Sequence, residues 1–318
     1  MKSVTVHVPA KVNLTLEILG RREDGYHFLR SIVMPVSIFE TVMVTAREEK
    51  HVDGGRASPR ADVTCQTQSE GVDMSELMKM PLENQLAVKA MRALQKTVKQ
   101  PLCAVDIHVT KRIPIRAGMA GGSADAAGVL LALNDLWELK WSRERLAQVG
   151  ATVGSDVAAL TLGGVVCLEG VGERVTRLEL GQNTIPFWMV VVWPGFGMCT
   201  QRAYDAFDQR LDLSRPQSTS IDIDRRYDAM LDALRAGDCE RVGECLHNDF
   251  EEVVFALRPE IYDWHRRLKK AGAMGVLLSG SGSAVFGIVR SREEGERIRE
   301  VLLWESPGVW CKVVEGIF

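Results

Sequence analysis

The residues whose types and spacing could do chemistry begin with a glycine-rich stretch at positions 113–127, Ile-Pro-Ile-Arg-Ala-Gly-Met-Ala-Gly-Gly-Ser-Ala-Asp-Ala-Ala. Gly118, Gly121 and Gly122 permit left-handed backbone angles and the close approach of a ligand. The stretch leads into apolar positions at helical spacing: Ala126, Leu130, Leu133 and Trp137. The first N–H groups of a helix lack intrahelical partners, so such a terminus suits an anion, most often a phosphate. The alternative is a tight turn before an ordinary buried helix. The stretch fits neither G-x-G-x-x-G nor G-x-x-x-x-G-K-[ST], the latter because no Lys follows the glycines, which disfavours a dinucleotide fold or a P-loop.

The composition indicates an ordinary soluble globular protein, with 318 residues, 46% hydrophobic residues, 25% charged residues and a net charge of −3. That charge argues against a broad nucleic-acid surface. The seven cysteines are scattered without C-x-x-C pairs, which favours reduced thiols over disulfides or a zinc site. No apolar run reaches membrane-spanning length. We therefore expect a cytoplasmic protein without a membrane or nucleic-acid partner, whose oligomeric state the sequence leaves open.

The elements that must position the glycine-rich stretch follow from hydrophobic periodicity. Alternation predicts strands at residues 4–8, 12–19 and 32–45, with a break at Pro9 and a hairpin turn at 24–25. We expect residues 47–81 to form an irregular, exposed excursion with turns at 53–55 and 58–59. Further strands are expected at 62–66, 104–110, 163–168, 187–193, 275–278 and 285–289, and helices at 81–94, 126–137, after Ser142, 200–211, 223–235, 239–246, 258–270 and 291–303. A boundary near residue 180 would give domains 1–180 and 181–318.

Three motifs, in order along the chain, resemble the GHMP small-molecule kinases. The first is Pro9-Ala-Lys11-Val-Asn13-Leu, continuing to Asp24-Gly-Tyr26-His27; the second is the glycine-rich stretch with Leu133-Asn-Asp-Leu-Trp137; the third is Leu278-Ser-Gly-Ser-Gly-Ser283. Short matches at 83–84, 154–157 and 169–173 lie between them, so the resemblance covers nearly the whole chain. The Asp-Gly-Tyr-His segment separates the sequence from mevalonate and homoserine kinases. It resembles members that act on 4-diphosphocytidyl-2-C-methyl-D-erythritol in non-mevalonate isoprenoid biosynthesis.

This resemblance implies an α+β, two-domain GHMP kinase fold with the active site in the cleft between the domains. It implies transfer of a phosphoryl group from ATP to the 2-hydroxyl of that substrate, with Asp156 as the catalytic acid/base and Lys11 beside it. Lys11 would keep Asp156 ionised and offset charge on the transferring group. Mg²⁺ would arrive with ATP, held by nucleotide and water ligands, so no protein set of metal ligands is predicted. Whether Asp156 acts as a base or orients the hydroxyl stays open.

The resemblance also assigns binding residues. Those expected to contact ATP are Ile113, Pro114, Ala117, Gly118, Met119, Ala120, Gly121, Gly122 and Ser123, with Asn84 and Lys111 near the adenine. Those expected to contact the second substrate are Asn13 near the acceptor, Tyr26 and His27 near the cytidine, Thr200, Tyr204 as an aromatic stacked on cytosine, Ser279, Gly280, Ser281 and Gly282.

Taken one at a time, these residues also fit structural roles. Lys11 could be an exposed lysine at a strand end, and Asp156 a helix N-cap after Gly154. Residues 279–283 could be a hairpin turn. The remaining structural alternatives are turn residues for Tyr26 and His27, core packing for Tyr204, a surface charge pair for Lys111 with Arg112, and a cap for Asn248-Asp249.

The sequence departs from the usual family pattern at several positions, while Lys11, Ser123 and Asp156 remain. These departures concern the details of nucleotide binding. Two other functions stay open: a GHMP kinase for a different alcohol, and a catalytically silent binding protein with this fold. The departing residues are Gln85, Arg116, Ala120, Ala124, Ser155, Ala158 and Ala284.

Overall fold

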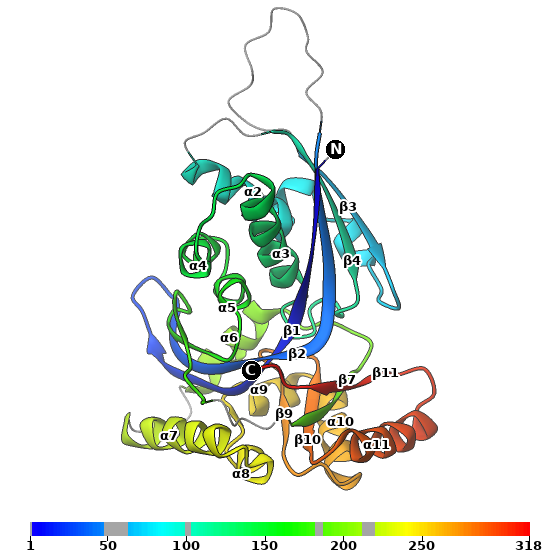
Figure 1. Ribbon diagram of the computed structural model, residues 1–318. Coiled ribbons are helices and arrows are strands. Elements are labelled where there is room, and N and C mark those ends of the chain that lie inside the picture. The colour runs from blue at the N-terminus through cyan, green and yellow to red at the C-terminus, as the bar shows by residue number, and fades with distance from the viewer. Residues whose placement is uncertain (1, 48–62, 99–102, 182–186, 212–219) are drawn as a thin grey trace, which may run out of the picture. The chain divides into compact units, whose positions relative to one another are not determined.

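The computed structural model describes residues 2–47, 63–98, 103–181, 187–211 and 220–318. The chain forms two compact units. Strands β1 (Ser3–Arg21) and β2 (His27–Ala46) contribute residues to both of them (Figure 1). The first unit comprises Met1–Ala10, Ile38–Ile115 and Ala120–Gly163, and the second Lys11–Ser37, Arg116–Met119 and Gly164–Phe318.

The first unit contains a sheet in which β4 lies between β2 and β3. Strand β4 pairs antiparallel with β2, with Val42 opposite Val109 and Val44 opposite Ile107, and parallel with β3. Alternate residues of β4 are buried, as a strand with one face on a core requires. The elements of this unit after β2 are β3 (Val63–Ser69), α1 (Ser75–Met78), a 3₁₀ turn (Leu82–Asn84), α2 (Leu86–Thr97), β4 (Val105–Lys111), α3 (Gly121–Leu136), α4 (Arg143–Ala151) and α5 (Ser155–Leu162).

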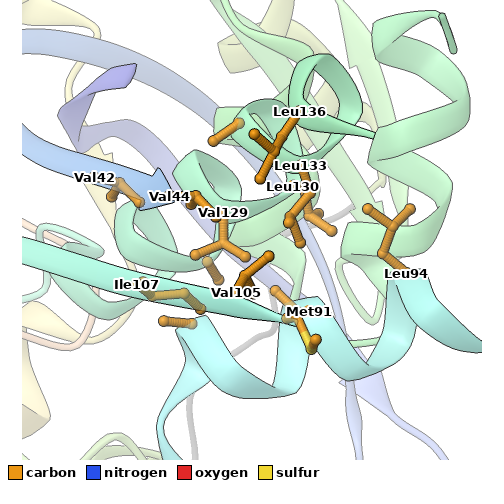
Figure 2. Close-up of a cluster of buried hydrophobic side chains, with 14 of the residues drawn as sticks. Val42, Val44, Met91, Leu94, Val105, Ile107, Val129, Leu130, Leu133 and Leu136 are labelled. Carbon is orange, nitrogen blue, oxygen red and sulfur yellow. The ribbon is translucent and has the colours of Figure 1, made fainter. Parts of the chain in front are cut away.

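Helices α2 and α3 pack their apolar side chains on this sheet. Figure 2 shows the valine and isoleucine side chains of β2 and β4 facing Met91 and Leu94 of α2 and the leucines of α3. Helix α3 is buried on most of its faces, because it packs against α2 and α5 as well as the sheet. Its close approach needs Gly128, since a Cβ there would lie 2.6 Å from Cγ2 of Val42. The core thus fixes the helix whose N-terminus carries the glycine-rich stretch.

The second unit contains a four-stranded antiparallel sheet with the strand order β11-β7-β10-β9. In the same unit β5 pairs with β2, β6 with β5, and the short β8 runs parallel to β1. The elements after β2 are β5 (Val166–Gly170), β6 (Arg174–Arg177), β7 (Trp188–Trp193), α6 (Thr200–Leu211), α7 (Ser220–Ala236), α8 (Cys239–Glu244), β8 (His247–Asn248), α9 (Glu251–Leu257), α10 (Pro259–Lys270), β9 (Val276–Leu278), β10 (Val285–Val289), α11 (Arg292–Glu305) and β11 (Trp310–Glu315).

The predicted mixture of helices and strands is confirmed, and α6 has the predicted bounds. The predicted break at Pro9 is wrong, because β1 continues through it. The fixed φ of proline suits extended backbone, and the neighbouring side chains of Val8 and Ala10 are buried. Residues 48–62 of the predicted excursion, with both of its expected turns, lie outside the described residues. The boundary near residue 180 stays a prediction, since the two compact units interleave along the chain.

Candidate active site

The N-terminus of α3 is formed by the second half of the glycine-rich stretch. Gly121, Gly122 and Ser123 make up its first turn, and Ala120, at φ +60°, precedes them without a side-chain cap. A Cβ on Gly121 would lie 3.1 Å from Cγ2 of Ile113 and 3.3 Å from the Lys111 Nζ, so only glycine fits comfortably there. Uncapped first-turn N–H groups at the positive end of a sixteen-residue helix attract an anion.

Lys111 lies next to the N-terminus of α3, in a buried network of charged groups. Its side chain is 2% exposed, and Nζ lies 2.7 Å from Glu40 Oε1 and 2.8 Å from Asp125 Oδ2. Burial alone would lower the pKa of Lys111, but the two carboxylates raise it, so the ammonium stays charged. Burial raises the pKa of Asp125, while the Lys111 charge opposes this shift. The surface charge pair considered for Lys111 and Arg112 is therefore wrong.

Glu40 also holds the backbone at the start of the glycine-rich stretch. Its carboxylate accepts hydrogen bonds from the backbone N–H groups of Arg112, at 2.8 Å, and Ile113, at 3.2 Å. Sequence reasoning missed Glu40 and Asp125. The signal for Glu40 was its position on the same strand face as Val42 and Val44, which are apolar and fully buried.

The segment that carries Asn84 lies beside the same helix terminus. A Cβ on Gly122 would be 3.4 Å from Cδ1 of Leu86, two residues after Asn84. Asn84 itself ends the 3₁₀ turn and is exposed. The first unit therefore brings Lys111, and Leu86 two residues after Asn84, to the start of α3, while the contacts of Lys111 and Asn84 with adenine stay a prediction.

Asp156 lies in the first turn of α5, which also packs against α3. The N-cap of α5 is Gly154, so the interpretation of Asp156 as the cap is wrong. A carboxylate in the first turn is favoured by the helix dipole, whatever its further role. Lys11 belongs to the other compact unit, and its expected pairing with Asp156 stays a prediction.

Lys11 is a buried residue within β1, at 4% exposure, so the interpretation as an exposed lysine at a strand end is wrong. Its Nζ donates a hydrogen bond of 2.7 Å to Oδ1 of Asn13. The Asn13 amide nitrogen donates in turn to Ser31 Oγ at 2.8 Å. These two hydrogen bonds fix both the position of the Lys11 ammonium and the orientation of the Asn13 amide.

All three sequence motifs meet at Gly280. A Cβ on this residue would lie 3.5 Å from Lys11 Nζ and 3.3 Å from both Asn13 Oδ1 and the Gly118 carbonyl oxygen. Ser279 Oγ donates to that same carbonyl at 3.0 Å. The backbone N–H of Lys11 donates to the Met119 carbonyl at 3.2 Å. Within the second unit, the first motif from Lys11 onward, residues 116–119 and the third motif therefore lie against one another.

Two departures from the family pattern coincide with unusual backbone. Arg116 has φ +54° and Ala120 has φ +60°, a region in which non-glycine residues are strained. Arg116 is exposed, and its carbonyl accepts a hydrogen bond of 2.9 Å from the Met198 N–H. The glycine-rich stretch therefore adopts a left-handed backbone conformation at Arg116 and Ala120, although neither is glycine, the residue that adopts it most easily.

Thr200 and Ser281 connect α6 to the third motif. Their hydroxyl oxygens are 2.9 Å apart, which is a hydrogen bond with either group as donor. Thr200 is the first residue of α6, so this contact lies at the start of that helix. Both residues were expected to contact the second substrate.

His27, Tyr204 and Asp208 form a cluster within the second unit, although His27 and Asp208 are 181 positions apart in sequence. The rings of His27 and Tyr204 stack with a centroid distance of 4.8 Å and an interplanar angle of 21°. His27 Nε2 lies 2.6 Å from Asp208 Oδ1, a contact that sequence reasoning missed. Tyr204 also packs on the core through Phe250, as its structural interpretation predicted. Tyr26 is 66% exposed in the turn before β2, whereas His27 is buried.

The thiols and helices add two general findings. All seven cysteines are free, as the scattered spacing predicted. Among the helices of the described segments, none is both long and apolar enough to cross a membrane.

The comparisons with known proteins agree across the whole chain. Family models described as GHMP kinases N terminal domain and GHMP kinases C terminal match residues 85–164 and 230–303. The chain is 37% identical over 302 residues to the 4-diphosphocytidyl-2-C-methyl-D-erythritol kinase of Symbiobacterium thermophilum, covering 95% of this chain and 96% of the relative. It is 34% identical to the enzyme of the same name from Shouchella clausii, covering 92% and 88%.

Solved structures give the same picture. A crystal structure of 4-(cytidine 5'-diphospho)-2C-methyl-D-erythritol kinase has a TM-score of 0.74 and 30% identity, and covers 99% of this chain and 100% of that one. The homoserine kinase of Cytophaga hutchinsonii has a TM-score of 0.74 at 17% identity, with 99% and 95% covered, and shows the fold alone. The predicted α+β GHMP fold is confirmed. With its motifs in family order and relatives matched over almost their full length, the chain belongs to the 4-diphosphocytidyl-2-C-methyl-D-erythritol kinases of the GHMP kinase family.

Proposed function

We propose that this protein transfers the γ-phosphoryl group of ATP to the 2-hydroxyl of 4-diphosphocytidyl-2-C-methyl-D-erythritol, giving the 2-phosphate and ADP. The observation that carries the proposal is the meeting of three motifs at Gly280, with the buried Lys11 ammonium among them. A fixed cation amid backbone carbonyls and loops suits phosphoryl transfer, which depends on positioning and charge neutralisation. The relatives with this printed activity support the same substrate.

The residues take the following roles. The first-turn N–H groups of Gly121, Gly122 and Ser123 hold phosphate oxygens of ATP, helped by the α3 dipole. Lys11 neutralises charge on the transferring group, and Asn13, oriented by Ser31, donates to or accepts from the acceptor. Asp156 accepts the proton of the acceptor hydroxyl or orients that hydroxyl.

The remaining contacts recognise the two ends of the substrates. Asn84 and Lys111 border the adenine, with the Lys111 ammonium already neutralised by carboxylates. Tyr204, His27 and Tyr26 supply aromatic and polar contacts to the cytidine. The rest of the two binding sets are loop residues: Ile113, Pro114, Ala117, Gly118, Met119 and Ala120 for ATP, and Thr200, Ser279, Gly280, Ser281 and Gly282 for the second substrate.

Mg²⁺ bound to ATP would supply charge neutralisation at the phosphates. The residues at the start of α3 suit this ion, because Mg²⁺ prefers oxygen ligands and Ser123 places a hydroxyl in the half-buried first turn. Most of its ligands would be phosphate oxygens and water. We place the reaction in the cytoplasm, which the seven free thiols support, since disulfides are rare in reducing compartments.

A coupled assay of ADP release tests the function, with the cytidine substrate, mevalonate and homoserine as alternative acceptors. We expect turnover with the cytidine substrate alone. Turnover with another acceptor would indicate a different GHMP kinase, and binding without turnover of any acceptor would indicate a silent binding protein.

The Asp156→Asn variant tests the mechanism. Asparagine has nearly the same size, so the fold and ATP affinity should persist while turnover falls by about 10² to 10⁴-fold. ATP affinity is measured by isothermal titration calorimetry. A turnover number near that of the wild type would refute the role of Asp156.

A further inference from the structure

Asn248 is a buried side chain whose polar atoms are all hydrogen-bonded to backbone groups of the second unit. It is 5% exposed and lies in β8, directly before α9. Its amide nitrogen donates 2.8 Å hydrogen bonds to two carbonyl oxygens, those of Leu278 and Gly280. Its amide oxygen accepts from the Phe250 N–H at 2.9 Å. The last bond is a turn contact that precedes α9, but the first two reach thirty residues along the chain.

The carbonyl groups held by Asn248 flank Ser279, the residue that contacts the glycine-rich stretch. Ser279 Oγ donates to the Gly118 carbonyl, and Gly280 is the meeting point of Lys11, Asn13 and Gly118. The opposite side of the same strand end is held by Glu251, whose carboxylate accepts from the Leu278 N–H at 3.0 Å. The loop at 279–283 is therefore held from β8 and α9 at Leu278, the residue before it, and from β8 at Gly280.

We propose that Asn248 is a positioning residue of the kinase site, acting through the backbone of Leu278 and Gly280 to fix the loop against Lys11 and Gly118. This inference deepens the proposed function and rests on it for its effect on catalysis. The hydrogen bonds of the Asn248 side chain all go to backbone groups. Its two N–H donors match two carbonyl acceptors, a pairing that only a primary amide of this length supplies here.

The chemistry of the amide makes the proposal testable with a nearly isosteric change. In Asn248→Asp, an ionised carboxylate would face the two carbonyl oxygens without a proton to donate, and the loop would be repelled. This environment raises the pKa of the introduced carboxyl group, and the protonated form regains one donor. The titratable and charged groups that also face this segment are Lys11, His247, Asp249, Glu251 and, from α10, His265, whose Nε2 lies 3.8 Å from Glu251 Oε1.

The matched control is Asn134→Asp. Asn134 uses its amide in the same manner, donating to the Trp141 carbonyl at 3.2 Å and accepting from the Trp141 N–H at 3.0 Å, but in the first unit. The Asn134→Asp variant therefore loses an amide donor in the same way, but at a residue whose amide does not bond the loop at 279–283.

The experiment measures kcat with ATP and the cytidine substrate from pH 6 to pH 8, as the ratio of variant to wild type at each pH. We expect Asn248→Asp to lose about 10²-fold at pH 8, since misplacing a catalytic group by about 1 Å costs this much. The ratio should recover by about tenfold toward pH 6 as the carboxyl group is protonated. Asn134→Asp should show a ratio independent of pH.

Hydrogen exchange supplies a readout that does not depend on the substrate. The N–H groups of Gly282 and Ala284 donate to Ser279 and Ala117 and report the order of the loop. They should lose protection in Asn248→Asp at pH 8 and keep it in Asn134→Asp. A folded Asn248→Asp protein with wild-type protection, or with a flat kcat ratio like that of the control, would overturn the proposal. If the wild type fails to turn over the cytidine substrate, the proposed function fails, and exchange alone decides whether Asn248 holds the loop.

Discussion

Gly118 gives the sharpest test of how closely the loops of the second unit approach each other. Its φ is +77°, and a Cβ there would lie inside van der Waals contact of the Ser279 carbonyl oxygen and 2.9 Å from its carbonyl carbon. Both atoms are backbone, in a loop whose hydrogen bonds hold it in place. Gly118→Ala therefore cannot be accommodated by a side-chain rotation.

The magnitude follows from two effects. A left-handed φ costs a non-glycine residue about 1–2 kcal/mol, which the loss of glycine entropy in the unfolded chain reduces by about 0.4–1 kcal/mol. Overpacking against backbone adds about 1–3 kcal/mol. The control Gly308→Ala has φ +86° and no atom within 4 Å of its Cβ, so it shows the first effect alone.

The assay is urea unfolding of both variants, followed by circular dichroism, with kcat/KM for ATP measured on the folded proteins. We expect Gly118→Ala to be about 1–3 kcal/mol less stable than Gly308→Ala, and its kcat/KM to fall by about 10²-fold. Equal stability of the two variants would refute the close approach, and normal activity of Gly118→Ala would refute its part in the site.

Three further substitutions test local features. Ala120→Gly relieves a strained φ of +60° and should stabilise the protein by up to about 1 kcal/mol in urea unfolding; a variant less stable than the wild type would contradict the strain. Gly128→Ala should lower the melting temperature although alanine favours helices, because overpacking on Val42 outweighs about 1 kcal/mol of propensity; a higher melting temperature would count against it. Burial raises the pKa of Glu251 to about 7, so its stabilising contribution is present at low pH and lost as pH rises through 7. The test is urea unfolding of the wild type and of Glu251→Gln, whose amide oxygen can still accept from the Leu278 N–H, at pH 5 and pH 8. The free energy of unfolding of the variant, relative to that of the wild type, should rise by up to about 3 kcal/mol from pH 5 to pH 8. If this difference is the same at both pH values, the raised pKa of Glu251 is contradicted.

Local periodicity and propensity were sufficient for the long elements. Helix α6 has its predicted bounds, and strand β7 (Trp188–Trp193) and helix α3 lie where runs of apolar residues and helical spacing indicated. Short elements were missed, among them α9 and β11, because their sequences are stabilised by packing and pairing with distant strands. The break predicted at Pro9 failed for the same reason, since burial of its neighbours outweighs a local signal.

The sequence by itself determined the chemistry of the site. The residue types and order of the three motifs identified the kinase family, and the glycines identified a helix terminus suited to phosphate. These features depend on residues that are neighbours along the chain, so they can be recognised without a structure.

Only the tertiary structure decided which residues hold that chemistry in place. Glu40, Lys111 and Asp125 form one buried network although Glu40 and Lys111 are 71 positions apart in number. Asn248 holds a loop 30 to 32 residues away. A charged or amide group that is buried loses its contacts with water and therefore needs a hydrogen-bond or charge partner. Which groups are buried is decided by the folded chain, so the sequence alone does not reveal these partners.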